Sequence, residues 1–199
     1  MIAIVDYGMG NLRSVQKAFE YLGYTAKITD RATDLKDADR IVLPGVGAFK
    51  DAIDALQKSG VEKVMKEEIA KGKPFLGICL GMQMLFDKSY EDGEYQGLGL
   101  VKGEVKRFET NLKVPHIGWN RLVVKKRTPL FDGVDDLNFY FVHSYHASGC
   151  RQEDIETTCE YSYEFTASVN KDNVWGVQFH PEKSGDSGLK LLANFAKIN

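Results

Sequence analysis

Short runs of consecutive apolar residues alternate, in the first half of the chain, with segments whose apolar residues recur every three or four positions. The runs at residues 2–5, 40–43 and 74–76 are typical of strands buried on both faces, and residues 25–29 alternate as a strand does. Helical spacing occurs at residues 12–22, 52–56 and 61–69. This alternation predicts an α/β fold with a doubly wound, mostly parallel central sheet flanked by helices.

The pattern changes after about residue 92, where strand-like segments follow one another at residues 104–108, 122–124 and 139–142. Because no long helical segment separates them, we expect additional antiparallel strands in the C-terminal half. Residues 189–196 have helical spacing and predict a final helix that packs on the sheet. We see no repeat or linker, and expect a single domain over residues 1–199.

Composition narrows the classes of function. The 199 residues are 43% hydrophobic and 27% charged, as in ordinary globular proteins, and a net charge of -2 provides no basic field for nucleic acid or an anionic membrane. The first residues lack the basic segment of a secretory signal, and no apolar run reaches the ~18 residues of a membrane span. We therefore expect a cytoplasmic protein.

The cysteines and glycines argue against bound groups. Three cysteines without a C-x-x-C pattern indicate neither a disulfide framework nor a zinc site. Gly8 and Gly10, which follow the first strand, lack the third glycine of the dinucleotide-binding motif. We expect no metal and no cofactor.

Cys79 lies where a buried strand turns sharply into a helix. Gly77 and Gly81 flank it symmetrically and remove the Cβ atoms that crowd so tight a turn, which is the pattern of a nucleophile elbow. The helix that follows directs free N–H groups and its positive end at the sulfur, and so favours the thiolate. A purely structural cysteine is the alternative, but it does not explain two glycines in a central strand.

A second chemical group follows the apolar run at residues 174–179. His180 ends that run and Glu182 lies two residues on, so an extended backbone places both side chains on one side, with Pro181 restraining the segment. The pattern predicts a base and the carboxylate that orients it. Three other histidines, none with a carboxylate at this spacing, remain alternative bases: His116, His143 and His146.

A glycine-rich turn ends the strand at residues 40–43. In an open parallel sheet ligands bind at the carboxyl ends of the strands, so we expect this turn and Cys79 to share one crevice. The backbone N–H groups of Val46, Gly47 and Leu80 are then candidates to stabilise an oxyanion beside the sulfur. Taken alone, the turn is only a strand-to-helix connection.

Gly-x-Cys-x-Gly at the elbow, with His-Pro-Glu about a hundred residues downstream, resembles the class I (triad) glutamine amidotransferases. Within that family the chain is similar to the glutaminase subunits of imidazole glycerol phosphate synthases. The similarity is carried by residues 6–12, 43–47, 79–83, 115–120, 141–145 and 180–184.

The resemblance implies that L-glutamine is hydrolysed to glutamate and ammonia through a thioester on Cys79. His180 would take the thiol proton and later activate water, while Glu182 fixes the imidazole's tautomer. The ammonia would pass to a separate (β/α)8-barrel cyclase subunit, in a heterodimer that serves histidine biosynthesis. Family position implies glutamine contacts by Gln83, Glu91, Ser144 and Tyr145, and partner contacts by Asn11, Tyr140 and Lys183.

The sequence itself offers a switch for such a partner, because Gly45 and Gly47 flank Val46 and leave the Gly45–Val46 peptide free to turn its N–H toward Cys79 when the partner docks. Two other interpretations stay open. A glutaminase subunit of pyridoxal phosphate synthase shares the triad, although residues 6–8 and 115–120 argue against it. The other is a cysteine peptidase or a non-catalytic binding module on the same fold, against which Gln83 and the oxyanion candidates speak.

Overall fold

The apolar runs of the first half form the parallel centre of a large sheet in the computed structural model, which describes residues 1–198. The parallel strands lie in the order β2-β1-β3-β4-β13. Their bounds are Ile2–Val5 for β1, Ala26–Thr29 for β2, Arg40–Gly45 for β3, Phe75–Cys79 for β4 and Val174–Val177 for β13. The predicted α/β fold with a mostly parallel centre is confirmed.

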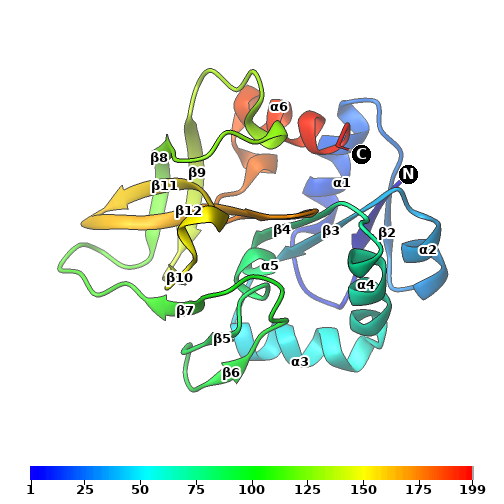
Figure 1. Ribbon diagram of the computed structural model, residues 1–199, viewed down its shortest axis with the longest axis horizontal. Helices are drawn as coiled ribbons and strands as arrows, with labels where there is room; N and C mark the ends of the chain where they lie inside the picture. The colour runs from blue at the N-terminus through cyan, green and yellow to red at the C-terminus, as the bar shows by residue number, and fades with distance from the viewer. Residues whose placement is uncertain (199) are drawn as a thin grey trace.

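Helices cover both faces of this parallel centre (Figure 1). On one face lie α1 (Leu12–Tyr21) and α6 (Gly185–Phe195), and on the other α2 (Ala32–Asp37), α3 (Phe49–Ser59) and α4 (Val61–Ala70). Side chains alternate between the faces, so Ile2 and Ile4 pack with α1 and α6, whereas Ala3 and Val5 pack on the opposite side. None of the helices within residues 1–198 has the length and apolarity that crossing a bilayer requires.

The C-terminal half adds the predicted antiparallel strands. From β13 the sheet continues through β12 (Tyr163–Lys171), β10 (Tyr145–Ser148), β7 (Glu104–Arg107), β5 (Lys88–Ser89) and β6 (Tyr95–Gln96), with β5 and β7 parallel to each other. A branch from β12 runs through β11 (Ile155–Tyr161), β8 (His116–Val124) and β9 (Asn138–His143). Three 3₁₀ turns complete the elements of residues 1–198: η1 (Pro129–Phe131), η2 (Gln152–Asp154) and η3 (Pro181–Lys183). The extent of the domain stays a prediction.

Two helices differ from the sequence-based expectation. The six-residue α2 was not predicted, because so short and polar a segment shows no usable periodicity. The helix expected after Cys79 is present but is a single turn, since α5 spans only Leu80–Gln83. The chain then tightens, with Leu85 N donating to Met82 O and Phe86 N to Gln83 O. A helix of one turn contributes little dipole, so the sulfur depends on nearby individual groups instead.

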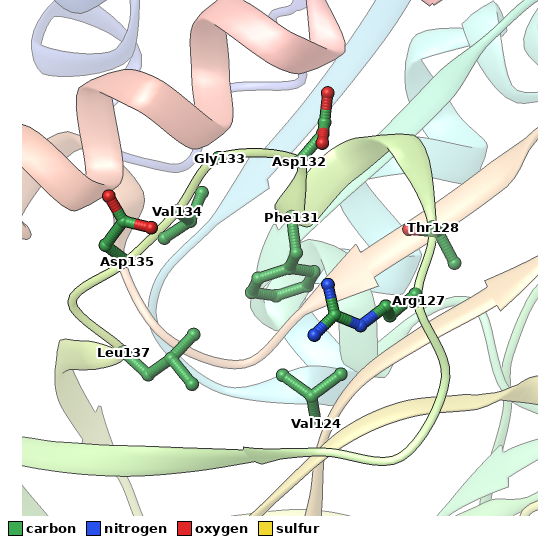
Figure 2. Close-up of a pocket in the computed structure, with 9 residues that line it drawn as sticks. All are labelled: Val124, Arg127, Thr128, Phe131, Asp132, Gly133, Val134, Asp135 and Leu137. Carbon is green, nitrogen blue, oxygen red and sulfur yellow. The ribbon is translucent and has the colours of Figure 1, made fainter.

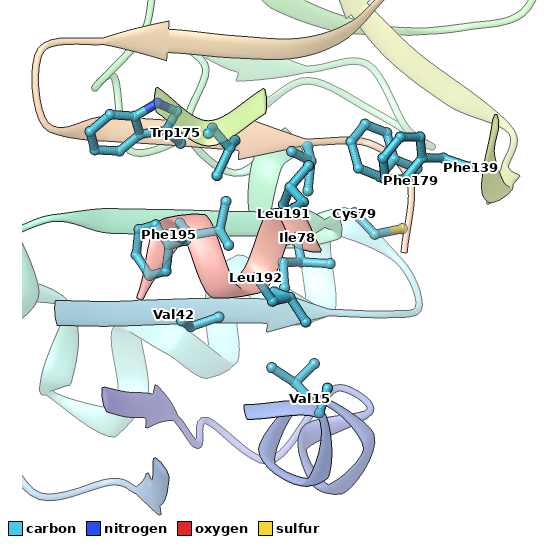
Figure 3. Close-up of a cluster of buried hydrophobic side chains, with 14 of the residues drawn as sticks. Val15, Val42, Ile78, Cys79, Phe139, Trp175, Phe179, Leu191, Leu192 and Phe195 are labelled. Atoms are coloured by element: carbon cyan, nitrogen blue, oxygen red, sulfur yellow. The ribbon is translucent and has the colours of Figure 1, made fainter. Parts of the chain in front are cut away.

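The turn from β4 into α5 depends on close backbone packing. A Cβ on Gly81 would lie 1.8 Å from the Leu43 carbonyl oxygen, and one on Gly77 would lie 2.7 Å from the Gly81 carbonyl oxygen. Cys79 itself has φ 55° and ψ -110°, a conformation that residues with side chains rarely adopt. The predicted elbow is therefore present, and the surrounding backbone holds its strained centre. Figure 3 shows Cys79 next to Ile78, at the end of β4 and within the cluster on the α1 and α6 face.

We expect Gly81→Ala to lower the free energy of unfolding by more than about 3 kcal/mol, because its methyl group meets rigid backbone. Gly60→Ala is the matched control: Gly60 has φ 75° but no atom within 4 Å of its ideal Cβ, so only the conformational cost of about 1 kcal/mol applies. Urea unfolding measures both. Equal losses in the two variants would mean that the elbow is not closely packed.

A buried carboxyl group lies away from the parallel centre, on β11. Glu156 is fully buried, accepts a hydrogen bond from Ser168 Oγ at 3.2 Å and another from Thr128 Oγ1. Burial raises the pKa of Glu156 to about 8, although Ser168 and the charge of Lys126 oppose this shift. The folded protein thus holds this proton more tightly than the unfolded chain.

This raised pKa makes stability depend on pH. The stabilisation from the bound proton is complete below the ordinary value of 4.5 and is lost as the pH rises toward 8. We expect Glu156→Gln to remove this loss, so that its stability relative to the wild type increases by at least about 1 kcal/mol between pH 5 and pH 8. Urea unfolding at both pH values tests this, with the exposed Glu160→Gln on the same strand as control. A difference that does not change with pH would contradict the assignment.

Candidate active site

A cavity of about 280 Å³ lies at the carboxyl ends of the parallel strands β3 and β4. Nine residues singled out from the sequence line it: Val46, Gly47, Cys79, Leu80, Gln83, Glu91, Tyr145, His180 and Lys183. Two more residues line it: His143, which was named from the sequence only as an alternative base, and Val142, which was not singled out as a site residue. The expectation that the glycine-rich turn and the elbow share one crevice is met by this cavity.

His180 and Glu182 form a buried pair beside the cavity. His180 Nδ1 lies 2.8 Å from Glu182 Oε1, and the two side chains are 2% and 1% exposed. The predicted geometry was wrong in one respect, because residues 181–183 form the 3₁₀ turn η3 and not an extended strand. His180 is extended, with φ -103° and ψ 95°, and the turn after it folds Glu182 back onto the imidazole.

The imidazole of His180 lies between two groups that favour its charged form. Burial opposes protonation, but the Cys79 sulfur and the Glu182 carboxylate outweigh it and raise the pKa of His180 to about 10. Its other ring nitrogen, Nε2, is buried and has no hydrogen-bond partner among the described residues. With Nδ1 engaged by Glu182, Nε2 is the atom left to exchange a proton at the cavity.

The three rival histidines have different surroundings. Burial lowers the pKa of His116 to about 4, that of His143 to about 3, and that of His146 below its ordinary value. His146 is bonded to Ala147 O and to the Tyr163 hydroxyl, both at 2.9 Å. These rings are therefore neutral structural groups at neutral pH, and His180 is the histidine suited to carry a proton.

A chain of side-chain amides connects the cavity wall to the sulfur. Gln83 Nε2 lies 3.0 Å from Tyr145 O and 3.0 Å from Gln178 Oε1, and Gln178 Nε2 lies 3.7 Å from Cys79 Sγ. Gln178 was missed from the sequence. Its signal was present, because it is the one polar residue in the run 174–179 and lies two positions before His180.

The glycine-rich turn of the oxyanion candidates is held at one end only. The Tyr7 hydroxyl donates to Pro44 O at 2.9 Å, and a Cβ on Gly45 would lie 2.7 Å from the same hydroxyl. Gly45 is thus closely packed, whereas the sequence predicted it to be free to change conformation. Gly47 has φ 101°, Val46 is 40% exposed, and within residues 1–198 neither N–H donates a hydrogen bond.

The two remaining candidates for substrate contact differ in position. Glu91 lines the cavity and its Oε2 accepts from the N–H of Phe49, the first residue of α3, at 2.8 Å. Burial raises the pKa of Glu91. Ser144 is not among the lining residues, and its carbonyl oxygen accepts from Phe108 N at 3.1 Å.

The three interface candidates lie around the same region. Lys183 lines the cavity directly. Tyr140 is on β9, and its carbonyl oxygen accepts from His180 N at 2.9 Å. Asn11 is the residue before α1, and its Oδ1 accepts from Ser14 Oγ at 2.8 Å, outside the cavity.

Another cavity, of about 310 Å³, lies beside η1 (Figure 2). Figure 2 shows the Arg127 guanidinium and the Phe131 ring directed into it. It contains none of the predicted site residues and no pair of a nucleophile and a base. Within residues 1–198 no three His, Cys, Asp or Glu side chains come together as metal ligands. The cavity at Cys79 is therefore the candidate active site.

Comparisons with known proteins identify the family of this chain. A sequence model of the family "Glutamine amidotransferase class-I" matches residues 3–198. The "Imidazole glycerol phosphate synthase subunit HisH" of Caldanaerobacter subterraneus subsp. tengcongensis is 52% identical over 199 residues, which cover 100% of this chain and 98% of that protein. The protein of the same name from Sulfurimonas denitrificans is 52% identical, with 99% and 98% covered.

Solved structures show the same fold at much lower identity. A structure titled "Crystal structure of glutamine amidotransferase" has a TM-score of 0.78 at 19% identity and covers 100% of both chains. The "Structure of PurLQS from Thermotoga maritima" also has a TM-score of 0.78, at 20% identity, covering 98% of this chain and 96% of that one. With a family match along nearly the whole chain and half of all residues shared with full-length relatives, this protein belongs to the class I glutamine amidotransferases.

Proposed function

We propose that this chain is the glutaminase subunit of an imidazole glycerol phosphate synthase, which hydrolyses L-glutamine and passes the ammonia to a separate cyclase subunit. One observation carries the chemistry: Cys79, on a strained elbow, shares a cavity with the buried His180–Glu182 pair. The full-length relatives, named as subunits of that synthase, support the choice among glutamine amidotransferases. Histidine biosynthesis is then the pathway served.

The first step forms a thioester. The Cys79 sulfur attacks the side-chain carbonyl carbon of glutamine, the C–N bond breaks, and the amide nitrogen leaves as ammonia. His180 accepts the thiol proton at Nε2 and delivers it to the leaving nitrogen. Glu182 holds Nδ1 in its protonated form and stabilises the positive charge on the imidazole. Together with the Cys79 sulfur, this carboxylate is the reason that the pKa of His180 is raised.

The second step releases glutamate. His180 takes a proton from water, the resulting hydroxide attacks the thioester carbonyl, and the thiol is regenerated with the proton returned by the imidazole. In both steps negative charge develops on the carbonyl oxygen, for which the N–H of Leu80 and an N–H from the Val46–Gly47 turn are the proposed donors. Gln83, Glu91 and Tyr145, which line the cavity, are the proposed contacts for the amino-acid end of glutamine. Ser144, which does not line it, is proposed to join them only by its family position.

Cys79→Ala is expected to lower glutamate release from glutamine by at least roughly a thousandfold, because no other described cysteine lines the cavity. The protein is assayed with its cyclase partner, by glutamate formed. Cys150→Ala serves as the control and should keep full activity, since Cys150 is outside the cavity. Substantial glutamate release by Cys79→Ala would refute the proposed function.

The surface beside the triad suits a protein partner. On β8 the side chains alternate, and Ile117 and Trp119 are 56% and 58% exposed. The Trp119 ring packs edge-on against Tyr140, which connects this surface to His180 through its carbonyl oxygen. Exposed apolar side chains of this size are typical of protein interfaces. We place the cyclase, proposed to be a (β/α)8 barrel, against this surface, with Asn11, Tyr140 and Lys183 in contact.

We expect the isolated chain to hydrolyse glutamine slowly and the cyclase, especially with its nucleotide ligand bound, to raise the rate roughly a hundredfold. An oxyanion donor is worth about 3 kcal/mol, and the unbonded Val46 and Gly47 N–H groups can supply one when the turn rearranges. The assay compares glutamate release by the chain alone, with cyclase, and with cyclase and ligand. Full turnover by the chain alone would contradict a partner-dependent oxyanion hole.

A further inference from the structure

The sulfur of Cys79 has a hydrogen-bond donor outside the triad. Gln178 Nε2 lies 3.7 Å from Cys79 Sγ, which is within hydrogen-bonding range for sulfur. Gln178 is fully buried, so water does not compete for this contact. A side-chain amide nitrogen can donate but not accept, and a donor stabilises the ionised sulfur relative to the neutral thiol.

The orientation of the Gln178 amide follows from its neighbours. The carbonyl oxygen of Tyr145 can only accept, so Gln83 must present its NH2 group to it, at 3.0 Å. The second hydrogen of that NH2 group is donated to Gln178 Oε1, also at 3.0 Å. With its oxygen fixed toward Gln83, Gln178 must direct its NH2 group to Cys79. The direction of the hydrogen bond at the sulfur is therefore set by a backbone carbonyl group.

The Tyr145 carbonyl is held from a second side. His143 Nδ1 lies 2.8 Å from it, and His143 Nε2 lies 3.0 Å from His116 Nδ1. Because burial lowers the pKa of both rings, each is neutral and has one donor and one acceptor. His143 thus donates to Tyr145 O and accepts from His116, whose Nε2 accepts from Asn120 Nδ2 at 3.2 Å. Both lone pairs of the carbonyl oxygen are occupied, which keeps it in place.

We propose that Gln178 is a further catalytic residue, whose amide stabilises the Cys79 thiolate before it attacks glutamine, and that Gln83 is the positioning residue that orients this amide. The inference rests on the proposed function, since it concerns the same nucleophile. The sulfur carries its charge before attack and shares none of it in the thioester, so this hydrogen bond favours the reactive state of the free enzyme. A reversed amide would present its oxygen and favour the neutral thiol instead.

The experiment measures the rate at which iodoacetamide alkylates Cys79 as a function of pH, on the full chain without glutamine, resolved by mass spectrometry of the Cys79 peptide. Gln178→Met has similar length but no donor, and is expected to slow alkylation at pH 7 about tenfold. The difference from the wild-type rate should shrink as the pH rises, because hydroxide removes the thiol proton whether or not the donor is present. Gln57→Met, on the exposed side of α3, is the control and should match the wild type.

Gln83→Glu tests the orienting step. A carboxylate cannot donate to Gln178 Oε1, so Gln178 turns its NH2 group toward residue 83 and its oxygen toward the sulfur. Slowing at pH 7 should be at least as large as for Gln178→Met. A wild-type pH profile in Gln178→Met, or a loss equal at every pH, would overturn the proposal.

If Gln178→Met does not fold, a wild-type pH profile of alkylation in Gln83→Glu overturns the proposal in its place.

A failure of the proposed function can be told apart from a failure of this inference. If the wild-type chain with its partner releases no glutamate while the Gln178 effect on alkylation remains, the glutaminase assignment is refuted and the hydrogen bond is not.

Discussion

The conformation of Cys79 depends on direct contact between the backbone of α5 and the ends of β3 and β4. Without Cβ atoms at Gly77 and Gly81, the first turn of α5 lies against the Leu43 carbonyl oxygen, and the chain can reverse within a single residue. That residue takes a positive φ at a local energetic cost, which the packing of the parallel sheet offsets. This contact sets the position of the Cys79 sulfur, around which the other polar groups of the cavity lie.

Burial and neighbouring charges decide which side chains around the sulfur are charged and which are neutral. His180 keeps a raised pKa because it lies between Cys79 and Glu182, whereas His143, in the same cavity wall, is held neutral. Two imidazoles of one cavity thus differ: His180 is the one proposed to move protons, and His143 fixes a backbone carbonyl. The same carbonyl orders Gln83 and Gln178, so one peptide group of β10 fixes the polar side chains around the Cys79 sulfur.

The fold could be predicted, and Cys79 could be singled out as a candidate, because local patterns carry both: apolar runs, helical spacing, and glycines two residues on either side of Cys79. The rest depends on contacts between distant segments. Gln178 and Cys79 are 99 positions apart, and the Tyr145 carbonyl, as backbone, has no sequence signature at all. The His180–Glu182 contact was predicted with the wrong backbone, because two-residue spacing does not distinguish a strand from the 3₁₀ turn that the structure has.

The central claim is that glutamine becomes covalently attached to the sulfur at the elbow. The most direct measurement is acid quenching of the protein and its partner during turnover, followed by mass spectrometry of the peptides that contain Cys79, Cys150 and Cys159. The account predicts a glutamyl adduct on Cys79 alone. An adduct on Cys150 or Cys159, or continued turnover with no adduct on Cys79, would contradict it.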